Sequence, residues 1–160
     1  MDYSHNIIFD TAGFLAGLQN YYNKIYTTSF VVNEVKDLKS RELLDLAIYA
    51  GKVIIMEPQE KSYSIVKDVA KRSLALKLSA TDLSVASLAY ELKPSLVFTD
   101  DLMLQNLLLN LGIEYKSVKL NIKIKNKKIY EYVCTGCGKK FTKYVSICPY
   151  CGNKIITRSI

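Results

Sequence analysis

The chain has 160 residues, of which 49% are hydrophobic, and a formal net charge of +7. This composition excludes a disordered polymer, and no apolar run reaches the length that spans a bilayer. The N-terminal residues MDYSHNIIFD lack the basic region and the long apolar stretch of a secretory signal, so we expect a cytoplasmic protein.

Short apolar runs alternate with longer helical patterns over residues 1–118. The predicted strands are Ile7–Phe9, Ile25–Thr27, Val53–Met56, Leu96–Phe98 and Ile113–Lys116. The predicted helices are Ala12–Tyr22, Phe30–Leu38, Arg41–Ala50, Lys61–Lys77, Asp82–Leu92 and Leu102–Leu111, the last of them closed by Gly112. This alternation predicts an α/β fold, in which helices cover both faces of a mainly parallel sheet.

Acidic residues stand at corresponding places in this pattern. Asp10 follows the run IIF, and Glu34 comes shortly after the second strand. Asp82 opens the helix DLSVASLAYEL, and Asp100 and Asp101 follow LVFT. In a parallel sheet these positions fall at or near the carboxyl ends of strands, which is the edge where open α/β sheets bind ligands.

Converging carboxylates repel one another unless a cation lies among them, so we expect Mg²⁺ or Mn²⁺ at this edge. Such ions polarise a phosphodiester, lower the pKa of a bound water and stabilise the leaving oxygen. The chain has one histidine, His5, and no plausible nucleophile triad. Hydrolysis by a metal-activated water is therefore the more economical mechanism, and it would leave a 3′-hydroxyl and a 5′-phosphate.

Each acid also has an ordinary structural explanation. Asp82 completes a capping-box pattern, and Asp10 suits the N-cap of a helix. Asp100 and Asp101 suit the positive end of the helix that follows them, and Glu34 suits a solvated helix face. The convergence of all these acids at one edge favours a metal site. This convergence is itself inferred from the predicted strands.

Positive charge is concentrated in the last part of the chain. Residues 1–118 have 12 Lys and Arg against 14 Asp and Glu, a net charge of −2, whereas 119–160 have 10 against the single Glu131, a net charge of +9. The segment 119–129 is a basic, strand-like connector, with Asn126 as the expected turn of a hairpin. A positive field favours a phosphate backbone as partner, and a merely solvated charged face is the equal alternative.

Four cysteines form two Cys-x-x-Cys pairs that ten residues separate: Cys134, Cys137, Cys148 and Cys151. Each pair can direct two sulfurs to one ion, and a glycine follows the second cysteine of each pair. Four thiolates describe a closed, structural Zn²⁺ site, which would supply folding energy to a segment too small for its own core. Two disulfides or a redox site are the weaker alternatives.

Lysines and aromatic rings are interleaved around the cysteines, which provides cations for phosphates and flat rings for unpaired bases. The predicted RNA-binding residues are Lys123, Lys125, Lys127, Lys128, Lys139, Lys140, Lys143 and Tyr144. Phe141 is expected to pack inside the ribbon instead.

Together these motifs resemble the PIN-domain ribonucleases. The resemblance rests on FDT at 9–11, Glu34 within SFVVNEVKD, SATDLSVASLAYEL at 79–92 and FTDDLMLQN at 98–106. A PIN domain followed by a four-cysteine ribbon is similar to the archaeal form of the Nob family, the endonucleases that mature the 3′ end of small-subunit ribosomal RNA.

The resemblance implies a Rossmann-like sheet and assigns roles to particular residues. The implied catalytic acids, which bind Mg²⁺ or Mn²⁺, are Asp10, Glu34, Asp82 and Asp101. Asp100 is adjacent to Asp101, and a site in which both bind metal is the alternative. The resemblance also implies that Thr11 and Thr99 support the acids with their hydroxyl groups.

The sequence thus predicts a PIN-like nuclease domain at 1–118, a basic connector at 119–129 and a zinc ribbon at 130–160. The expected function is cleavage of single-stranded pre-rRNA at the 3′ end of 16S rRNA, in the pre-30S particle and alongside ribosome-assembly factors. One alternative is a toxin-like PIN ribonuclease acting on tRNA or mRNA, against which the basic ribbon argues. The other is a non-catalytic RNA-binding scaffold whose acids only cap helices.

Overall fold

The computed structural model describes residues 5–72, 78–119, 130–141 and 145–159. The chain divides into two compact units, Met1–Ile122 (the first unit) and Lys123–Ile160 (the second unit), and each is described by itself. The predicted connector and its Asn126 turn lie almost wholly outside the described residues, so the predicted domain boundaries stay predictions. No helix in the described ranges is long and apolar enough to cross a membrane.

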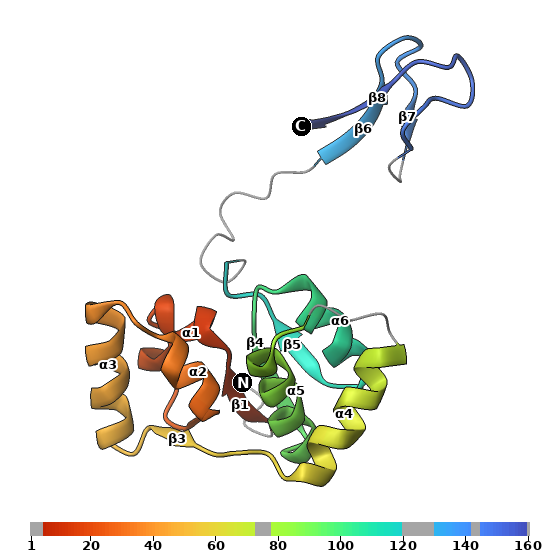
Figure 1. The fold of residues 1–160 in the computed structure, drawn as a ribbon. Helices are drawn as coiled ribbons and strands as arrows, with labels where there is room; N and C mark the ends of the chain where they lie inside the picture. Colours follow the sequence, from red (N-terminus) through yellow and green to blue (C-terminus); the bar gives the residue numbers. More distant parts are fainter. Residues whose placement is uncertain (1–4, 73–77, 120–129, 142–144, 160) are drawn as a thin grey trace. The chain divides into compact units, whose positions relative to one another are not determined.

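The first unit is built on a five-stranded sheet whose paired strands all run parallel (Figure 1). Its strands are β1 (Asn6–Phe9), β2 (Ile25–Thr27), β3 (Val53–Ile55), β4 (Ser95–Phe98) and β5 (Glu114–Lys116), in the order β3-β2-β1-β4-β5. The order changes direction between β1 and β4, which pair along their whole length. Open α/β sheets bind ligands outside the carboxyl ends of strands at such a switch point.

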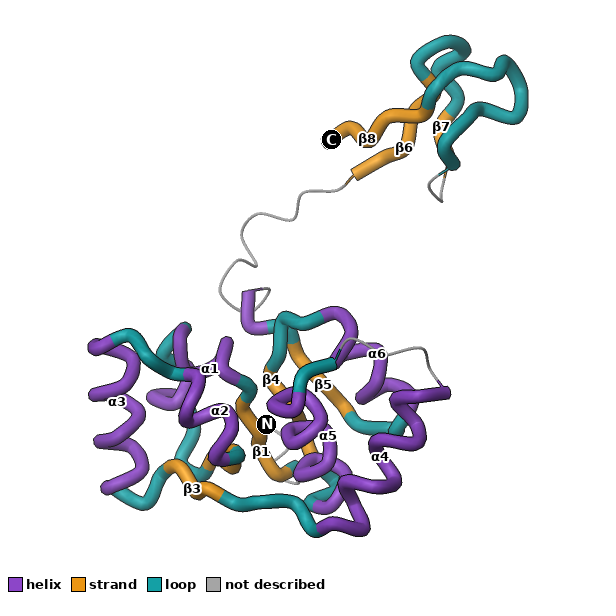
Figure 2. The backbone as a smooth tube through the Cα atoms, in the orientation of Figure 1, coloured by secondary structure: helices purple, strands orange, loops and turns teal. Residues whose placement is uncertain are grey.

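Helices flank this sheet in two groups (Figure 2). The helical elements are α1 (Thr11–Leu15), the 3-10 helix η1 (Leu18–Tyr21), α2 (Ser29–Glu34), α3 (Leu38–Tyr49), α4 (Glu60–Arg72), α5 (Ala80–Glu91) and α6 (Leu102–Asn110). Helix α1 packs against α2 and α3, whereas α4, α5 and α6 pack against one another. The predicted α/β fold with a parallel sheet flanked by helices is therefore confirmed.

Several predicted helix bounds differ from those in the structure, and the last five residues of the helix predicted over 61–77 lie outside the described residues. The helix predicted over 12–22 is interrupted at Gly17, whose φ of 73° is left-handed and favours glycine. The helix predicted over 30–38 ends at Glu34, because Asp37 instead accepts a 3.0 Å hydrogen bond from the Ser40 N–H and caps α3. Glu34 is consequently the last residue of its helix rather than a residue in its middle.

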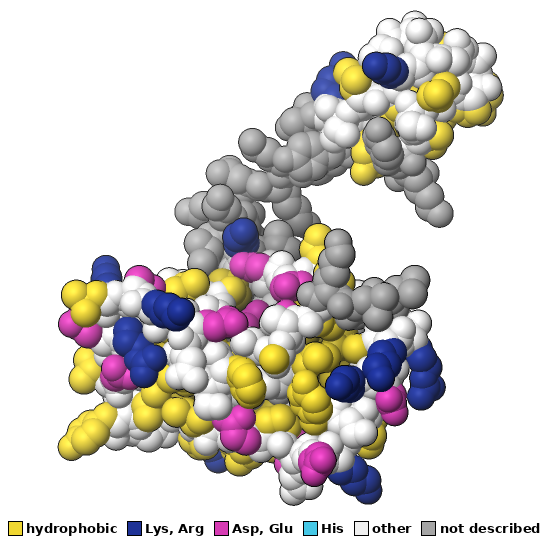
Figure 3. Space-filling model, in the orientation of Figure 1, with side chains coloured by type: hydrophobic (Ala, Val, Ile, Leu, Met, Phe, Trp, Pro, Cys, Tyr) yellow, Lys and Arg dark blue, Asp and Glu magenta, His cyan; other side chains and the backbone are white. Residues whose placement is uncertain are grey.

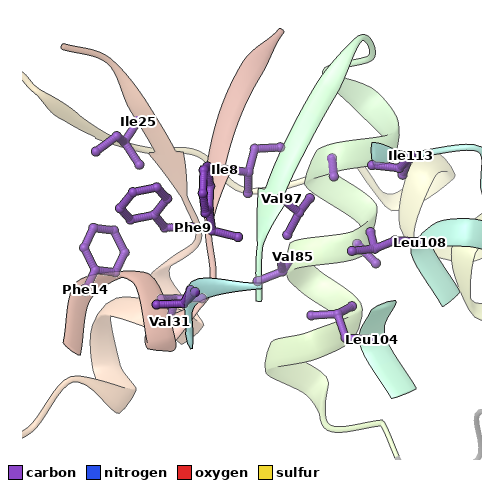
Figure 4. Close-up of a cluster of buried hydrophobic side chains, with 14 of the residues drawn as sticks. Ile8, Phe9, Phe14, Ile25, Val31, Val85, Val97, Leu104, Leu108 and Ile113 are labelled. Atoms are coloured by element: carbon purple, nitrogen blue, oxygen red, sulfur yellow. The ribbon is translucent and has the colours of Figure 1, made fainter. Parts of the chain in front are cut away.

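Buried side chains from the strands and both helix groups form one core (Figure 4). The ring of Phe9 contacts those of Phe14 and Phe98, with centroids 5.2 Å and 5.3 Å apart. Val85 of α5 and Leu104 of α6 are fully buried in the same core. Burying each such side chain stabilises the fold by about 1.5–3 kcal/mol. This core therefore fixes the positions of the strand and helix ends that carry the candidate site.

The second unit contains a three-stranded antiparallel sheet in the order β7-β6-β8. Its strands are β6 (Tyr130–Cys134), β7 (Lys140–Phe141) and β8 (Ile155–Ser159). The buried cluster consists of Cys134, Cys148 and Ile155, and Phe141 packs against it as predicted. A core this small rarely sustains a fold without a metal or a disulfide.

Candidate active site and metal centre

Asp10 directly follows β1 and is the N-cap of α1. Its Oδ1 accepts a 2.7 Å hydrogen bond from the Thr11 N–H, and its Oδ2 accepts a 2.9 Å bond from the hydroxyl of Thr99. Thr99 is fully buried and directly follows β4, the partner strand of β1. The Asp10 carboxyl group is therefore fixed at the switch point of the sheet.

Glu34 is held by two threonine hydroxyls from different elements. Its Oε2 accepts a 3.0 Å hydrogen bond from Thr11 Oγ1, and its Oε1 accepts a 2.7 Å bond from Thr81 Oγ1. Thr11 opens α1 next to Asp10, and Thr81 lies in the first turn of α5 next to Asp82. The carboxylate at the end of α2 is thus tied to the two segments that carry neighbouring acids.

Asp82 completes the capping box that the sequence predicts. Its Oδ2 accepts hydrogen bonds from the Ser79 N–H at 3.1 Å and the Ser79 hydroxyl at 2.8 Å, and the Ser79 Oγ accepts one from the Asp82 N–H at 3.1 Å. Both bonds to the carboxylate go to one oxygen. Within the described residues, Oδ1 accepts no hydrogen bond, so the cap orients Asp82 and leaves an oxygen for a further ligand.

Asp101 is the N-cap of α6 and leaves one oxygen in the same way. Its Oδ1 accepts from the N–H groups of Met103 and Leu104 at 2.8 Å and 3.1 Å. Its own N–H donates a 3.2 Å bond to Thr99 Oγ1, the hydroxyl that also holds Asp10. One threonine therefore sets the positions of two acids.

Asp100, the neighbour of Asp101, has different partners. Its Oδ1 accepts a 2.6 Å hydrogen bond from the Ser117 hydroxyl and a 3.2 Å bond from the Lys119 N–H. Both donors follow the end of β5, so Asp100 anchors the chain where it leaves the sheet. The two adjacent aspartates therefore have different hydrogen-bond partners: Asp101 caps α6, and Asp100 binds the segment after β5.

The four acids share one electrostatic field, and acidic side chains gather on the face of the first unit that Figure 3 shows. Burial raises the pKa of Asp10, and the negative charges of Asp82 and Glu34 raise it further, against hydrogen bonds that lower it. Burial also raises the pKa of Asp82, with further contributions from Asp101 and Glu34. The structure thus brings Asp10, Glu34, Asp82 and Asp101 together.

Neutral groups supply all the hydrogen bonds to these four carboxylates. In the described part of the chain, none of them lies within ion-pair distance of a lysine or arginine. The sulfurs of the cysteine cluster all lie within 4.8 Å of one another, but no three of these carboxylates bring ligand oxygens that close together. An open set of oxygens without a protein cation fits Mg²⁺ or Mn²⁺, because such ions retain several waters and use few carboxylates.

The four cysteines of the second unit form a compact cluster whose sulfur atoms all lie within 4.8 Å of one another. The sulfurs of Cys134 and Cys151 are 3.3 Å apart, and those of Cys137 and Cys148 are 3.7 Å apart. Disulfide sulfurs are about 2.05 Å apart, and all four cysteines are free thiols. Sulfurs about 3.8 Å apart surround a tetrahedral ion with bonds of about 2.3 Å, so the cluster fits Zn²⁺.

The backbone turns around the cluster explain the glycines. Gly138 and Gly152 follow the second cysteine of each pair with φ values of 70° and 76°, which are left-handed. Hydrogen bonds from the side chain and backbone of Asn153 lower the pKa of Cys151 to about 6. The predicted zinc-ribbon fold is confirmed.

Two of the predicted RNA-binding residues lie in the described part of the second unit. Lys139 Nζ lies 3.4 Å from the ring centroid of the exposed Tyr150, whereas Lys140 Nζ forms a 2.7 Å ion pair with Glu131. Glu131 also forms a 2.7 Å ion pair with Arg158, so it compensates the charge of Lys140 only in part, whereas Lys139 presents its charge with an aromatic ring. The predicted residues outside the described ranges are Lys123, Lys125, Lys127, Lys128, Lys143 and Tyr144.

Sequence reasoning did not single out Thr81. Its position next to Asp82 was a signal, but its hydrogen-bond partner, Glu34, lies 47 residues away. Local patterns do not reveal a contact at that separation.

Over residues 7–92 the chain matches the family described as PIN domain of ribonuclease. It is 41% identical over 152 residues to Endoribonuclease Nob1 of Pyrococcus abyssi, a match that covers 93% of this chain and 91% of that protein. It is 31% identical over 157 residues to Endoribonuclease Nob1 of Methanothermobacter thermautotrophicus, a match that covers 94% of this chain and 91% of that protein. It is also 37% identical over 76 residues to the 20S-pre-rRNA D-site endonuclease NOB1 of Saccharomyces cerevisiae, covering 47% of this chain and 17% of that protein.

Proposed function

The chain belongs to the PIN-domain ribonucleases and, within them, to the Nob1 endoribonucleases, and from this membership we propose its substrate and its metal. The proposed activity is Mg²⁺- or Mn²⁺-dependent cleavage of single-stranded pre-rRNA at the 3′ end of 16S rRNA. The name of the yeast relative, a pre-rRNA endonuclease, supports this substrate class. The proposed setting is the pre-30S particle in the cytoplasm, with assembly factors as further partners.

The observation that carries the proposal is that acids from three helix starts and one helix end are held near one another by threonine hydroxyls, with no lysine or arginine of the described residues within ion-pair distance. In this proposal Asp10, Glu34, Asp82 and Asp101 hold the catalytic ion or ions, and Thr11 and Thr99 support them. The hydrogen bonds of Asp100 to the end of β5 favour Asp101 as the ligand of this pair.

The chain's own residues prepare the site for hydrolysis. Thr99 fixes the position of Asp10 relative to Asp101, and the capping box uses one oxygen of Asp82 and leaves the other without a hydrogen bond from the described residues. The divalent cation, when bound, supplies polarisation of the phosphodiester and a lowered pKa of the attacking water. Hydrolysis of the phosphodiester, with water added to phosphorus and the 3′ oxygen as the leaving group, would leave a 3′-hydroxyl and a 5′-phosphate.

The second unit is proposed to hold RNA rather than to cleave it. Four thiolates leave no open position on a Zn²⁺ ion, which supplies folding energy when bound. Lys139 and the exposed Tyr150 present a cation and a ring at one place, a combination that suits a phosphate and an unpaired base. The basic residues predicted over 123–128, together with Lys143 and Tyr144, extend this proposal.

The test is cleavage of an RNA that spans the 16S 3′ end by the purified chain in Mn²⁺, with the cut mapped to the nucleotide. Asp82→Asn removes a proposed ligand, and Asp68→Asn on the exposed face of α4 is the matched control. We expect one cut for the wild type and the control and none for Asp82→Asn. Equal cleavage of mature tRNA would contradict the proposed substrate, and cleavage by Asp82→Asn would contradict the proposed site.

A further inference from the structure

Thr81 is a buried hydroxyl residue in the first turn of α5, with 6% of its surface exposed. Its Oγ1 donates a 2.7 Å hydrogen bond to Oε1 of Glu34, the shorter of the two bonds that hold this carboxylate. Thr81 directly precedes Asp82. A single dipeptide of α5 therefore contributes one acid to the site and a donor to another acid of the site.

Further hydroxyl groups tie the two helices that make this contact. Ser84 Oγ donates a 2.7 Å bond to the Thr81 carbonyl oxygen and lies 2.9 Å from Thr28 Oγ1. Thr28 is the N-cap of α2, and Glu34 is the last residue of that helix. Both ends of α2 are consequently joined to the first five residues of α5, and Thr28 and Ser84 are both buried.

Hydrogen bonds from two threonines restrict the orientation of the Glu34 carboxylate. A glutamate at a helix end has three side-chain torsions and would otherwise move among several rotamers. Thr11 and Thr81 each bind one of its oxygens, so the carboxylate plane is set by donors on two sides. Each carboxylate oxygen can accept more than one bond, so the threonines leave capacity for a cation.

We propose that Thr81 is a positioning residue for the divalent-cation site: its hydroxyl fixes the Glu34 carboxylate so that Glu34 and Asp82 present oxygens to the same ion. This inference rests on the proposed function, because it concerns the same site. Partners that orient metal ligands typically change metal affinity or activity about 10- to 100-fold when they are removed. Thr81 acts through Glu34, so its removal weakens metal binding and high metal concentrations restore cleavage.

The variants separate this role from packing. Thr81→Val retains the shape of the side chain and removes the donor, and Thr81→Ser retains the donor. Ser87→Ala is the matched control, because Ser87 is a buried hydroxyl residue of the same helix that, among the described residues, bonds only to the Leu83 carbonyl oxygen. Thr81→Ala, compared with Thr81→Ser, provides the same contrast if the valine variant does not fold.

Mn²⁺ binding to the full-length, zinc-loaded protein is measured by electron paramagnetic resonance without RNA, and thermal unfolding is measured without Mn²⁺. We expect Thr81→Val to bind Mn²⁺ about 10- to 100-fold more weakly, with Thr81→Ser and Ser87→Ala near the wild type. The Mn²⁺ concentration for half-maximal cleavage should rise in parallel, and the maximal rate should recover at saturation.

Three results would contradict the positioning role or the proposed site. If Glu34→Gln loses Mn²⁺ binding and cleavage while Thr81→Val binds Mn²⁺ like the wild type, the positioning role is wrong and the proposed site stands. If Glu34→Gln keeps metal-dependent cleavage, the proposed site itself is wrong. A loss in Thr81→Val that saturating Mn²⁺ does not restore also contradicts the positioning role.

Discussion

Thr99 Oγ1 donates a 2.9 Å hydrogen bond to Oδ2 of Asp10, although 89 residues separate them in sequence. The bond joins the carboxyl ends of β4 and β1, the two strands between which the order of the sheet changes direction. The same hydroxyl accepts from the Asp101 N–H, so it fixes the distance between two proposed metal ligands.

Replacement of Thr99 by valine should affect both stability and cleavage. The variant leaves the buried Asp10 carboxylate without one donor, which costs about 1–3 kcal/mol. We expect a lower free energy of unfolding in urea and a reduced cleavage rate, and Thr99→Ser should recover most of both. An unchanged urea midpoint in Thr99→Val would show that this hydrogen bond has no such role.

The adjacent residues Asp100 and Asp101 should respond differently to substitution by asparagine. Asp101→Asn removes a proposed metal ligand, so cleavage should fall on the order of 100-fold, as when one electrostatic group of a catalytic site is lost. Asp100→Asn keeps an oxygen that can accept from Ser117 and Lys119, so cleavage should stay near the wild-type rate. Single-turnover rates with saturating Mn²⁺ make the comparison, and equal losses would contradict the separation of roles.

Removal of zinc should unfold the second unit alone. Its buried cluster contains two cysteines and Ile155, whereas the first unit has an extensive apolar core of its own. Amide NMR spectra recorded during titration with a zinc chelator should lose the dispersed signals of residues 130–159 and keep those of 5–119. Cys148→Ser should have the same effect without chelator, and collapse of both sets of signals would disagree with this account.

Tyr150 should contribute to RNA affinity through stacking. Tyr150→Ala removes the exposed ring over which Lys139 lies, and a stacked base typically contributes about 1–3 kcal/mol. Tyr49→Ala is the matched control, since Tyr49 is an exposed tyrosine of α3 in the first unit. Fluorescence anisotropy with labelled single-stranded RNA measures both, and an unchanged affinity for Tyr150→Ala would exclude this ring from the interface.

Three acids of the proposed site carry a local signal in the sequence. Asp10 directly follows β1, Asp101 is the third residue after β4, and Asp82 opens a helix through a capping box, so the rule for parallel sheets places them at one edge. Those same acids also cap helices. The structural and functional explanations of these residues therefore apply together, because a cap uses one carboxylate oxygen of Asp82 and of Asp101 and leaves the other.

Features that depend on contacts between residues far apart in the sequence could not be predicted from local patterns. The hydrogen bond between Thr81 and Glu34 spans 47 residues, and only the partners of Asp100 distinguish it from Asp101. The break of the first predicted helix at Gly17 also could not be predicted from the local sequence. Glycine tolerates both a helical and a left-handed backbone, and the fold decides between them.

The most direct test of the acidic site is anomalous diffraction from crystals of the full chain soaked in Mn²⁺. The account predicts a manganese peak among the carboxylate oxygens of Asp10, Glu34, Asp82 and Asp101, and loss of that peak in Asp82→Asn. Manganese bound elsewhere, with these four carboxylates free of metal, would contradict it.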